Sequence, residues 1–163
     1  FRLTLHTPND RFPNDSRIAQ AVAQMWTRIG VRTEVDALPW TSFSARGARQ
    51  EFAISLTSWG STSGEGLSFP TNILATYNVA ARTGPANSRR YSNAELDAMI
   101  EAAAVTMDEA ARERAVHGLV RLVAREAPAF PIMHLQNVWA HRRGLRHDPR
   151  MDERTLAMGI RAD

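Results

Sequence analysis

Phe1-Arg2-Leu3-Thr4-Leu5-His6, the stretch that opens the chain, alternates apolar with polar side chains, which is the period of a β-strand. Apolar residues then recur at helical spacing over residues 18–29, and Gly30 is placed to end that helix. Residues 31–37 alternate again and predict a second strand. A strand, a helix and a strand in this order predict a β-α-β unit with parallel strands and a right-handed crossover.

Further elements extend this unit. Residues 52–59 predict a third strand, after which residues 59–66 form a loop of small side chains. A capping-box pattern with Ser92 at the N-cap opens a helix, and Asp108 is expected to cap a longer one. We therefore predict the α/β class, with a mostly parallel sheet of at least three strands flanked by helices.

The composition narrows the classes of protein. The chain has 163 residues, enough for one domain or one lobe of a larger protein, and 44% of them are hydrophobic. Cysteine is absent, which excludes disulfide scaffolds and thiolate metal sites. All 20 basic residues are Arg and the formal net charge is only +3, so charge does not force a nucleic-acid partner. The chain opens directly on a strand pattern without a signal peptide, and we expect a mature form or a piece of a longer protein.

The predicted sheet indicates where a binding site would lie. In open parallel sheets, ligands bind beyond the carboxyl ends of the strands, and those ends are here residues 7–15 and 59–66. Trp59 either closes the edge of the core or forms one wall of a ligand cleft. In the second case its ring and the neighbouring backbone N–H groups suit a zwitterionic or peptide-like ligand.

Other chemistries have weaker support in the sequence. The five histidines lack the spacing of a metal site on a helix, so no metal is expected. The alternative to a binding protein is a small α/β hydrolase that uses Ser61 or Ser63, although Thr62 stands where a nucleophile elbow needs Ser. The loop also lacks the Gly-Lys-Ser/Thr ending of a phosphate-binding loop, and the chain carries no nucleic-acid motif.

Five segments carry a resemblance that runs nearly from end to end. They are residues 3–14, residues 28–31, residues 58–65 (Ser58-Trp59-Gly60-Ser61-Thr62-Ser63-Gly64-Glu65), residues 87–97 and residues 130–134 (Phe130-Pro131-Ile132-Met133-His134). In this order they resemble the C-terminal lobe of the family 5 extracellular solute-binding proteins. These are the receptors of peptide, dipeptide, glutathione and nickel ABC importers.

The resemblance implies one lobe of a type II periplasmic-binding-protein-like fold, without catalysis and without a cofactor. Relatives have two lobes that close about a hinge on a peptide or similar small solute and then dock on the ABC permease subunits. Residues 1–144 would form the C-terminal lobe, and residues 145–163 would be a tail that returns to a first lobe absent from this chain. The implied location is periplasmic or otherwise extracytoplasmic.

The resemblance also implies a set of site residues. The loop after the third strand holds the ligand's backbone in peptide-binding relatives, and Thr62 falls where dipeptide receptors place an Asp that pairs with the ligand's α-amino group. Thr cannot offer that charge, but Glu65 lies nearby and could serve instead. Asn87 is a weaker candidate whose other reading is a hydrogen bond within its loop. The expected ligand-binding residues are Asn9, Arg11, Trp59, Gly60, Ser61, Thr62, Glu65 and Asn87.

Overall fold

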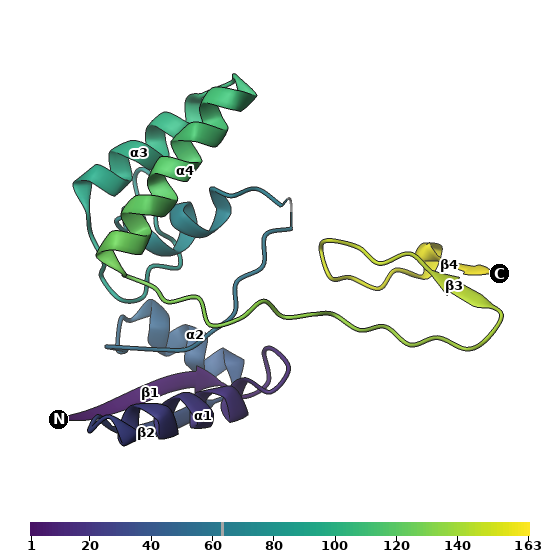
Figure 1. Cartoon of the computed structure of the whole chain (residues 1–163), viewed down its shortest axis with the longest axis horizontal. Helices are drawn as coiled ribbons and strands as arrows, with labels where there is room; N and C mark the ends of the chain where they lie inside the picture. Colours follow the sequence, from purple (N-terminus) through teal and green to yellow (C-terminus); the bar gives the residue numbers. More distant parts are fainter. Residues whose placement is uncertain (63) are drawn as a thin grey trace.

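The computed structural model describes residues 1–62 and 64–163, in which a sheet-and-helix unit, a helical hairpin and a long C-terminal arm follow one another (Figure 1). In chain order the elements are β1 (Arg2–Pro8), α1 (Asp15–Arg28), β2 (Arg32–Leu38), α2 (Trp40–Ala48), the π-helical turn η1 (Pro70–Leu74), α3 (Ala94–Val105), α4 (Glu109–Glu126), β3 (Leu145–His147), the 3-10 turn η2 (Ala157–Gly159) and β4 (Ile160–Ala162). Within these residues, no helix combines the length and the apolar character that crossing a bilayer requires.

The β-α-β unit predicted at the start of the chain is confirmed. β1 and β2 are parallel neighbours, with Leu5 opposite Val35, and α1 packs on them. Gly30 follows α1 with a φ of 91°, a left-handed conformation that glycine adopts without strain. The face of α1 that meets the sheet carries Ala19 and Ala23, which are buried, with larger apolar side chains half-buried beside them.

The third strand is a correction to the sequence prediction, because residues 52–59 do not form a ladder. They meet β1 at a single parallel bridge between His6 and Ser55, where the Leu56 N–H donates to the His6 carbonyl at 2.8 Å. The apolar alternation was real, since Phe52 and Leu56 are both buried. It reflects packing rather than strand pairing: the Phe52 ring stacks on His6 at 4.4 Å between centroids, and the backbone then turns away from the sheet.

Helices α3 and α4 form an antiparallel hairpin over a second core, separate from the core under the sheet. Asp108 caps α4 as predicted, since its carboxylate accepts the Ala111 N–H at 2.7 Å. The predicted cap of α3 is wrong by one residue. Asn93 is the N-cap, and Ser92 instead shares a hydrogen bond of 2.9 Å with the hydroxyl of Thr76.

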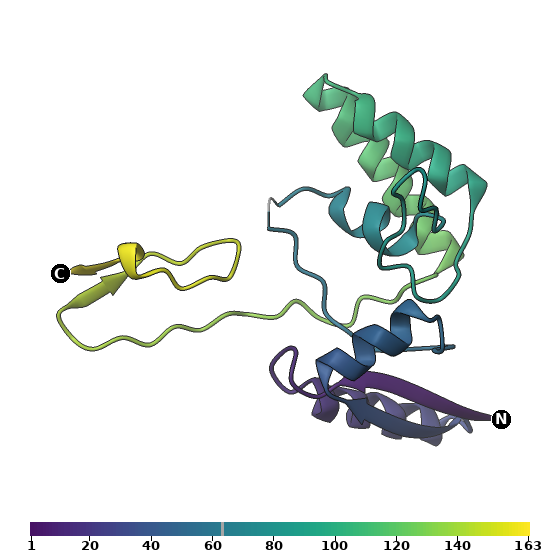
Figure 2. The ribbon, with the colours of Figure 1, turned by 180° about the vertical axis from the view of Figure 1, so that it is seen from behind.

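The arm after α4 runs away from both cores and returns as a small hairpin (Figure 2). Residues 129–142 belong to no helix or strand, a turn follows at residues 143–144, and β3 and β4 pair antiparallel with Leu145 opposite Ala162. Large apolar side chains of the arm are in solvent, with Phe130 78% and Val138 89% exposed. The arm therefore has little contact with the rest of the described chain, apart from the tip of its hairpin.

Candidate functional site

The two loops expected to bind ligand leave the sheet at the same edge. β1 ends at Pro8, and the segment through Ser55 runs parallel to it, so the chain after each points the same way. The loop after β1 and the segment that climbs from the sheet towards the helical hairpin start together at this edge in both views (Figures 1 and 2). The structure thus provides the arrangement that ligand sites in open α/β sheets require.

The first loop presents Arg11 on an aromatic support. The backbone N–H of Asn9 donates to the Leu38 carbonyl at 2.9 Å, while the Asp10 carboxylate accepts the Trp40 N–H at 2.7 Å. These bonds fasten the loop to the start of α2. The Arg11 guanidinium carbon lies 5.2 Å from the centroid of the Trp40 ring, a cation–π contact. Within residues 1–62 and 64–163 Arg11 forms no ion pair, so its donors are available to a carboxylate.

Trp40 is a further aromatic residue at this edge of the sheet, which the sequence analysis did not name as a candidate. Its signal was present, because an aromatic residue directly after the Pro39 that ends β2 must lie at the same sheet edge as the first loop. Trp40 is 38% exposed, and its ring lies beneath the guanidinium of Arg11.

Trp59 stands at the start of the second loop with 41% of its surface exposed. Its indole N–H donates to the Ser68 hydroxyl at 3.3 Å, which anchors one edge of the ring. Trp59 is thus anchored at one edge and partly exposed, and its role as one wall of a ligand cleft stays a prediction. Gly60 and Thr62 beside it are exposed as well.

The hydrolase alternative has no support in the second loop. The Ser61 hydroxyl donates to the backbone carbonyl of Glu65 at 3.3 Å, which holds the loop closed on itself. Ser63 lies outside the described residues. Among the described residues, no group of His, Cys, Asp and Glu side chains has the arrangement of a metal site.

Glu65 is tied to the helical hairpin rather than free to replace the missing Asp charge. One carboxylate oxygen lies 2.8 Å from the guanidinium of Arg112 on α4, and the other accepts the Leu67 N–H at 3.3 Å. This pair neutralises the charge of Glu65. Nothing in the local sequence could have indicated Arg112, which is 47 residues away along the chain.

Asn87 takes the structural role that was its second reading. The side chain is only 4% exposed, and its amide N–H groups donate to the Ala75 carbonyl at 2.9 Å and the Tyr91 carbonyl at 2.7 Å. Its amide oxygen accepts the Tyr91 N–H at 3.3 Å. These bonds use most of its hydrogen-bonding capacity, so the side chain links the backbone at Ala75 to the backbone at Tyr91.

The tip of the C-terminal hairpin touches the second loop, which the sequence analysis did not anticipate. A Cβ atom at Gly60 would lie 3.7 Å from a carboxylate oxygen of Glu153, and one at Gly64 would lie 3.0 Å from the sulfur of Met151. Gly64 has a φ of 69° as well, so conformation and space both favour glycine there. The small residues of the loop leave room for the tip.

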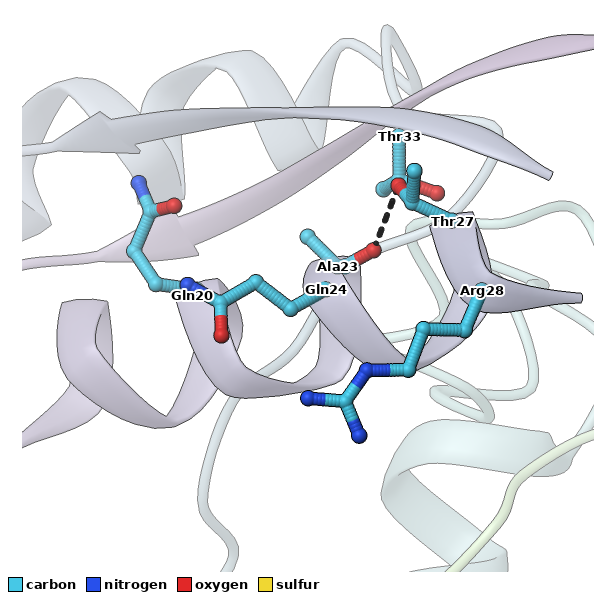
Figure 3. A pocket seen from close by; sticks show the side chains of 6 residues that line it. All are labelled: Gln20, Ala23, Gln24, Thr27, Arg28 and Thr33. Atoms are coloured by element: carbon cyan, nitrogen blue, oxygen red, sulfur yellow. Dashed lines mark hydrogen bonds between the residues drawn. The ribbon is translucent and has the colours of Figure 1, made fainter. Parts of the chain in front are cut away.

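A hollow of about 360 Å³ lies elsewhere, between α1 and the start of β2 (Figure 3). It is lined by Gln20, Ala23, Gln24, Thr27, Arg28 and Thr33. Thr33 is near the beginning of β2, whereas both candidate loops follow the ends of their strands. Within the hollow, the Thr27 hydroxyl donates to the Ala23 carbonyl at 2.8 Å. The hollow therefore lies on the flank of α1, at the end of the sheet opposite the candidate loops.

The parallel β-α-β unit and the helices that follow it have the fold of one lobe of a type II periplasmic binding protein. Residues 1–81 match the family described as bacterial extracellular solute-binding proteins, family 5 Middle. This match and the relatives below support the resemblance to family 5 solute-binding proteins that the sequence indicated.

Similar proteins support the same assignment. Heme-binding protein A of Haemophilus influenzae is 25% identical over 122 residues, which cover 75% of this chain and 22% of that protein. The dipeptide-binding protein of Pseudomonas aeruginosa is 23% identical over 122 residues, which again cover 75% of this chain and 22% of that protein. The chain therefore spans about a fifth of the length of these relatives.

Two solved structures show the same fold. The Escherichia coli murein tripeptide binding protein MppA has a TM-score of 0.77 at 21% identity, over 99% of this chain and 31% of that one. HbpA2 from Haemophilus parasuis has a TM-score of 0.75 at 19% identity, over 100% of this chain and 32% of that one. Because the likeness to HbpA2 extends over the whole chain, it includes the arm and its hairpin.

Proposed function

We propose that this chain is the ligand-binding lobe of the receptor of an ABC importer, and that it holds a peptide or similar small solute without transforming it. The observation that carries the proposal is the pair of loops at one edge of the parallel sheet, one with Arg11 stacked on Trp40 and the other with the exposed face of Trp59. The names of relatives, which include dipeptide-binding and murein tripeptide binding proteins, agree with this class of solute.

Each loop has a distinct task in this proposal. Arg11 grips a carboxylate of the solute through two parallel N–H bonds, because its guanidinium is held on Trp40 and has no partner of its own among the described residues. The face of Trp59 covers the solute's backbone, and the N–H groups of the exposed residues Gly60 and Thr62 bind its carbonyl oxygens. No bond is made or broken, so the protein needs neither a cofactor nor a nucleophile.

The proposal includes a division of the chain. Residues 1–144 belong to this lobe, and residues 145–163 are a tail that packs on a first lobe elsewhere in the intact protein. The exposed apolar side chains of the tail support the division, because Met158 and Ile160 need a partner that the described residues do not supply. A tail on the first lobe would face the second loop of this lobe across the ligand, and solute would hold the two lobes closed.

The partners follow from this mechanism. The closed receptor docks on the ABC permease subunits outside the cytoplasm, and the first lobe of the same protein supplies the other half of the site. Stimulation of the reconstituted importer's ATPase by the receptor only when solute is present would support this part of the proposal.

Calorimetry on the intact protein tests the function. The panel contains dipeptides, tripeptides, glutathione and heme, the last because it stands in the name of one relative. Replacement of Arg11 by Ala should weaken binding of the best peptide roughly 10- to 100-fold, since a shielded charged hydrogen bond is lost. Arg17→Ala, an exposed arginine on α1, is the matched control and should bind as the original does. If no solute of the panel binds, the proposal is wrong.

A further inference from the structure

The geometry points to Glu153, at the tip of the C-terminal hairpin, as the residue that binds the cationic group of the solute. This inference rests on the proposed function and names a specificity-determining contact within it. Its basis is the position of the Glu153 carboxylate against Gly60, the residue directly after Trp59.

The second loop offers no other unpaired carboxylate for a cation. Glu65 is bound by Arg112 at 2.8 Å, and Thr62 carries no charge. At the tip itself, Asp152 is paired with Arg150 at 2.5 Å, and this hydrogen bond lowers the pKa of Asp152 to about 2. In the part of the chain that the structure describes, Glu153 forms no ion pair, so its charge remains uncompensated.

The tip is built in a way that holds Glu153 in this position. The Glu153 N–H donates to the Arg150 carbonyl at 3.2 Å and closes a turn, and the Asp152 carboxylate accepts the Arg154 N–H at 3.3 Å. Glu153 has a φ of 62°, a conformation that a residue with a side chain adopts only where its surroundings impose it. On the other side of the turn, Met151 lies against Gly64. The side chains of Glu153 and Met151 therefore lie beside two glycines of the loop, in space that a larger residue there would occupy.

The chemistry that matches this arrangement is an amino or guanidinium group next to an extended backbone. A solute whose backbone lies on the face of Trp59 would pass Gly60, where the missing side chain exposes the Glu153 carboxylate. Arg11 at the other loop suits the opposite end of the same solute. The site then selects zwitterions, with the negative end at Arg11 and the positive end at Glu153.

The division of the chain gives this contact a second consequence. Glu153 belongs to the tail and Gly60 to the lobe, so a cation bound by Glu153 joins the two parts only when they are close together. The residue would thus contribute both to the choice of solute and to closure of the receptor on it.

Paired peptides test the inference on the intact protein. The probes are a peptide that the original protein binds, with a free amino group, and the same peptide with that amine acetylated. The original protein should prefer the free amine roughly 10- to 100-fold, as expected for a charge-assisted bond, and Glu153→Gln should lose most of that preference while its affinity for the acetylated peptide stays unchanged. Glu101→Gln, an exposed glutamate on α3, is the control and should keep the preference.

The outcomes separate this inference from the proposed function. If the original protein binds the peptide but Glu153→Gln discriminates the two forms as well as the original does, the assignment of Glu153 is wrong and the receptor function stands. A missing preference in the original protein overturns the assignment as well, and needs no variant. If the original protein binds no peptide at all, the proposed function fails and this inference fails with it.

Discussion

Replacement of Asn87 by Ala distinguishes a loop anchor from a ligand contact. The change removes two donors and one acceptor from a side chain that is 4% exposed. The Ala75 carbonyl, on a residue that is 2% exposed, is left without its partner and without access to water. A buried polar group left unpaired costs about 1–3 kcal/mol, and the half-buried backbone groups of Tyr91 add less because water reaches them. The expected loss in the free energy of unfolding is about 2–4 kcal/mol.

Urea unfolding followed by circular dichroism measures this loss, provided that the slope of the transition is unchanged. Asn78→Ala is the matched control, because Asn78 is exposed and its side-chain oxygen accepts the Ala81 N–H at 3.0 Å, so its loss should stay below about 1 kcal/mol. The reasoning is refuted if Asn87→Ala unfolds at the same urea concentration as the original protein but binds its solute more weakly. That result would return Asn87 to the ligand site.

Three further predictions concern the helical hairpin and the tip. Leu96→Ala, at a fully buried position of the second core, should lower the unfolding free energy by about 2–5 kcal/mol, whereas Val105→Ala, 77% exposed, should change it little; equal losses would contradict the packing. Asp108→Ala should cost about 1 kcal/mol through the lost cap of α4, and Asp108→Asn should restore most of it, both read from thermal melts. The pKa of Asp152, measured by carbon NMR, should be about 2, because Arg150 stabilises the ionised carboxylate. The stability that this pair contributes is then complete above pH about 4 and is lost as the pH falls through 2. A measured pKa near the ordinary 3.8 would show that the pair is absent.

Local patterns were enough for the first half of the fold. The alternation in residues 1–6 and 31–37, with a helix between them that ends at Gly30, led directly to parallel strands. The segment at residues 52–59 shows the limit of that reasoning. Alternating burial arises equally from a paired strand and from an extended segment whose aromatic residues pack on neighbours, and the sequence does not distinguish them.

The site was predictable only as far as the strand ends determine it. Residues 7–15 and 59–66 had to share an edge once the strands were parallel, and that expectation agrees with the structure. The partners of the loop side chains come from remote parts of the chain, and local sequence carries no trace of them. Arg112 on α4, which pairs with Glu65, and Glu153 in the C-terminal hairpin, which lies beside Gly60, are both examples of such remote partners.

The two apolar cores of this chain are joined along the sequence by one short tether, and Arg90 adds a hydrogen bond of 2.6 Å to Gln50 between the parts of the chain that hold them. Leu56 is the last buried residue of the sheet's core and Leu67 the first of the hairpin's, and the ten residues between them include Trp59 and Glu65. The two cores share no buried apolar residue among those described. A solute that orders this tether would therefore couple the unfolding of one core to the unfolding of the other. At saturating solute, two separate thermal transitions should then merge into one cooperative transition.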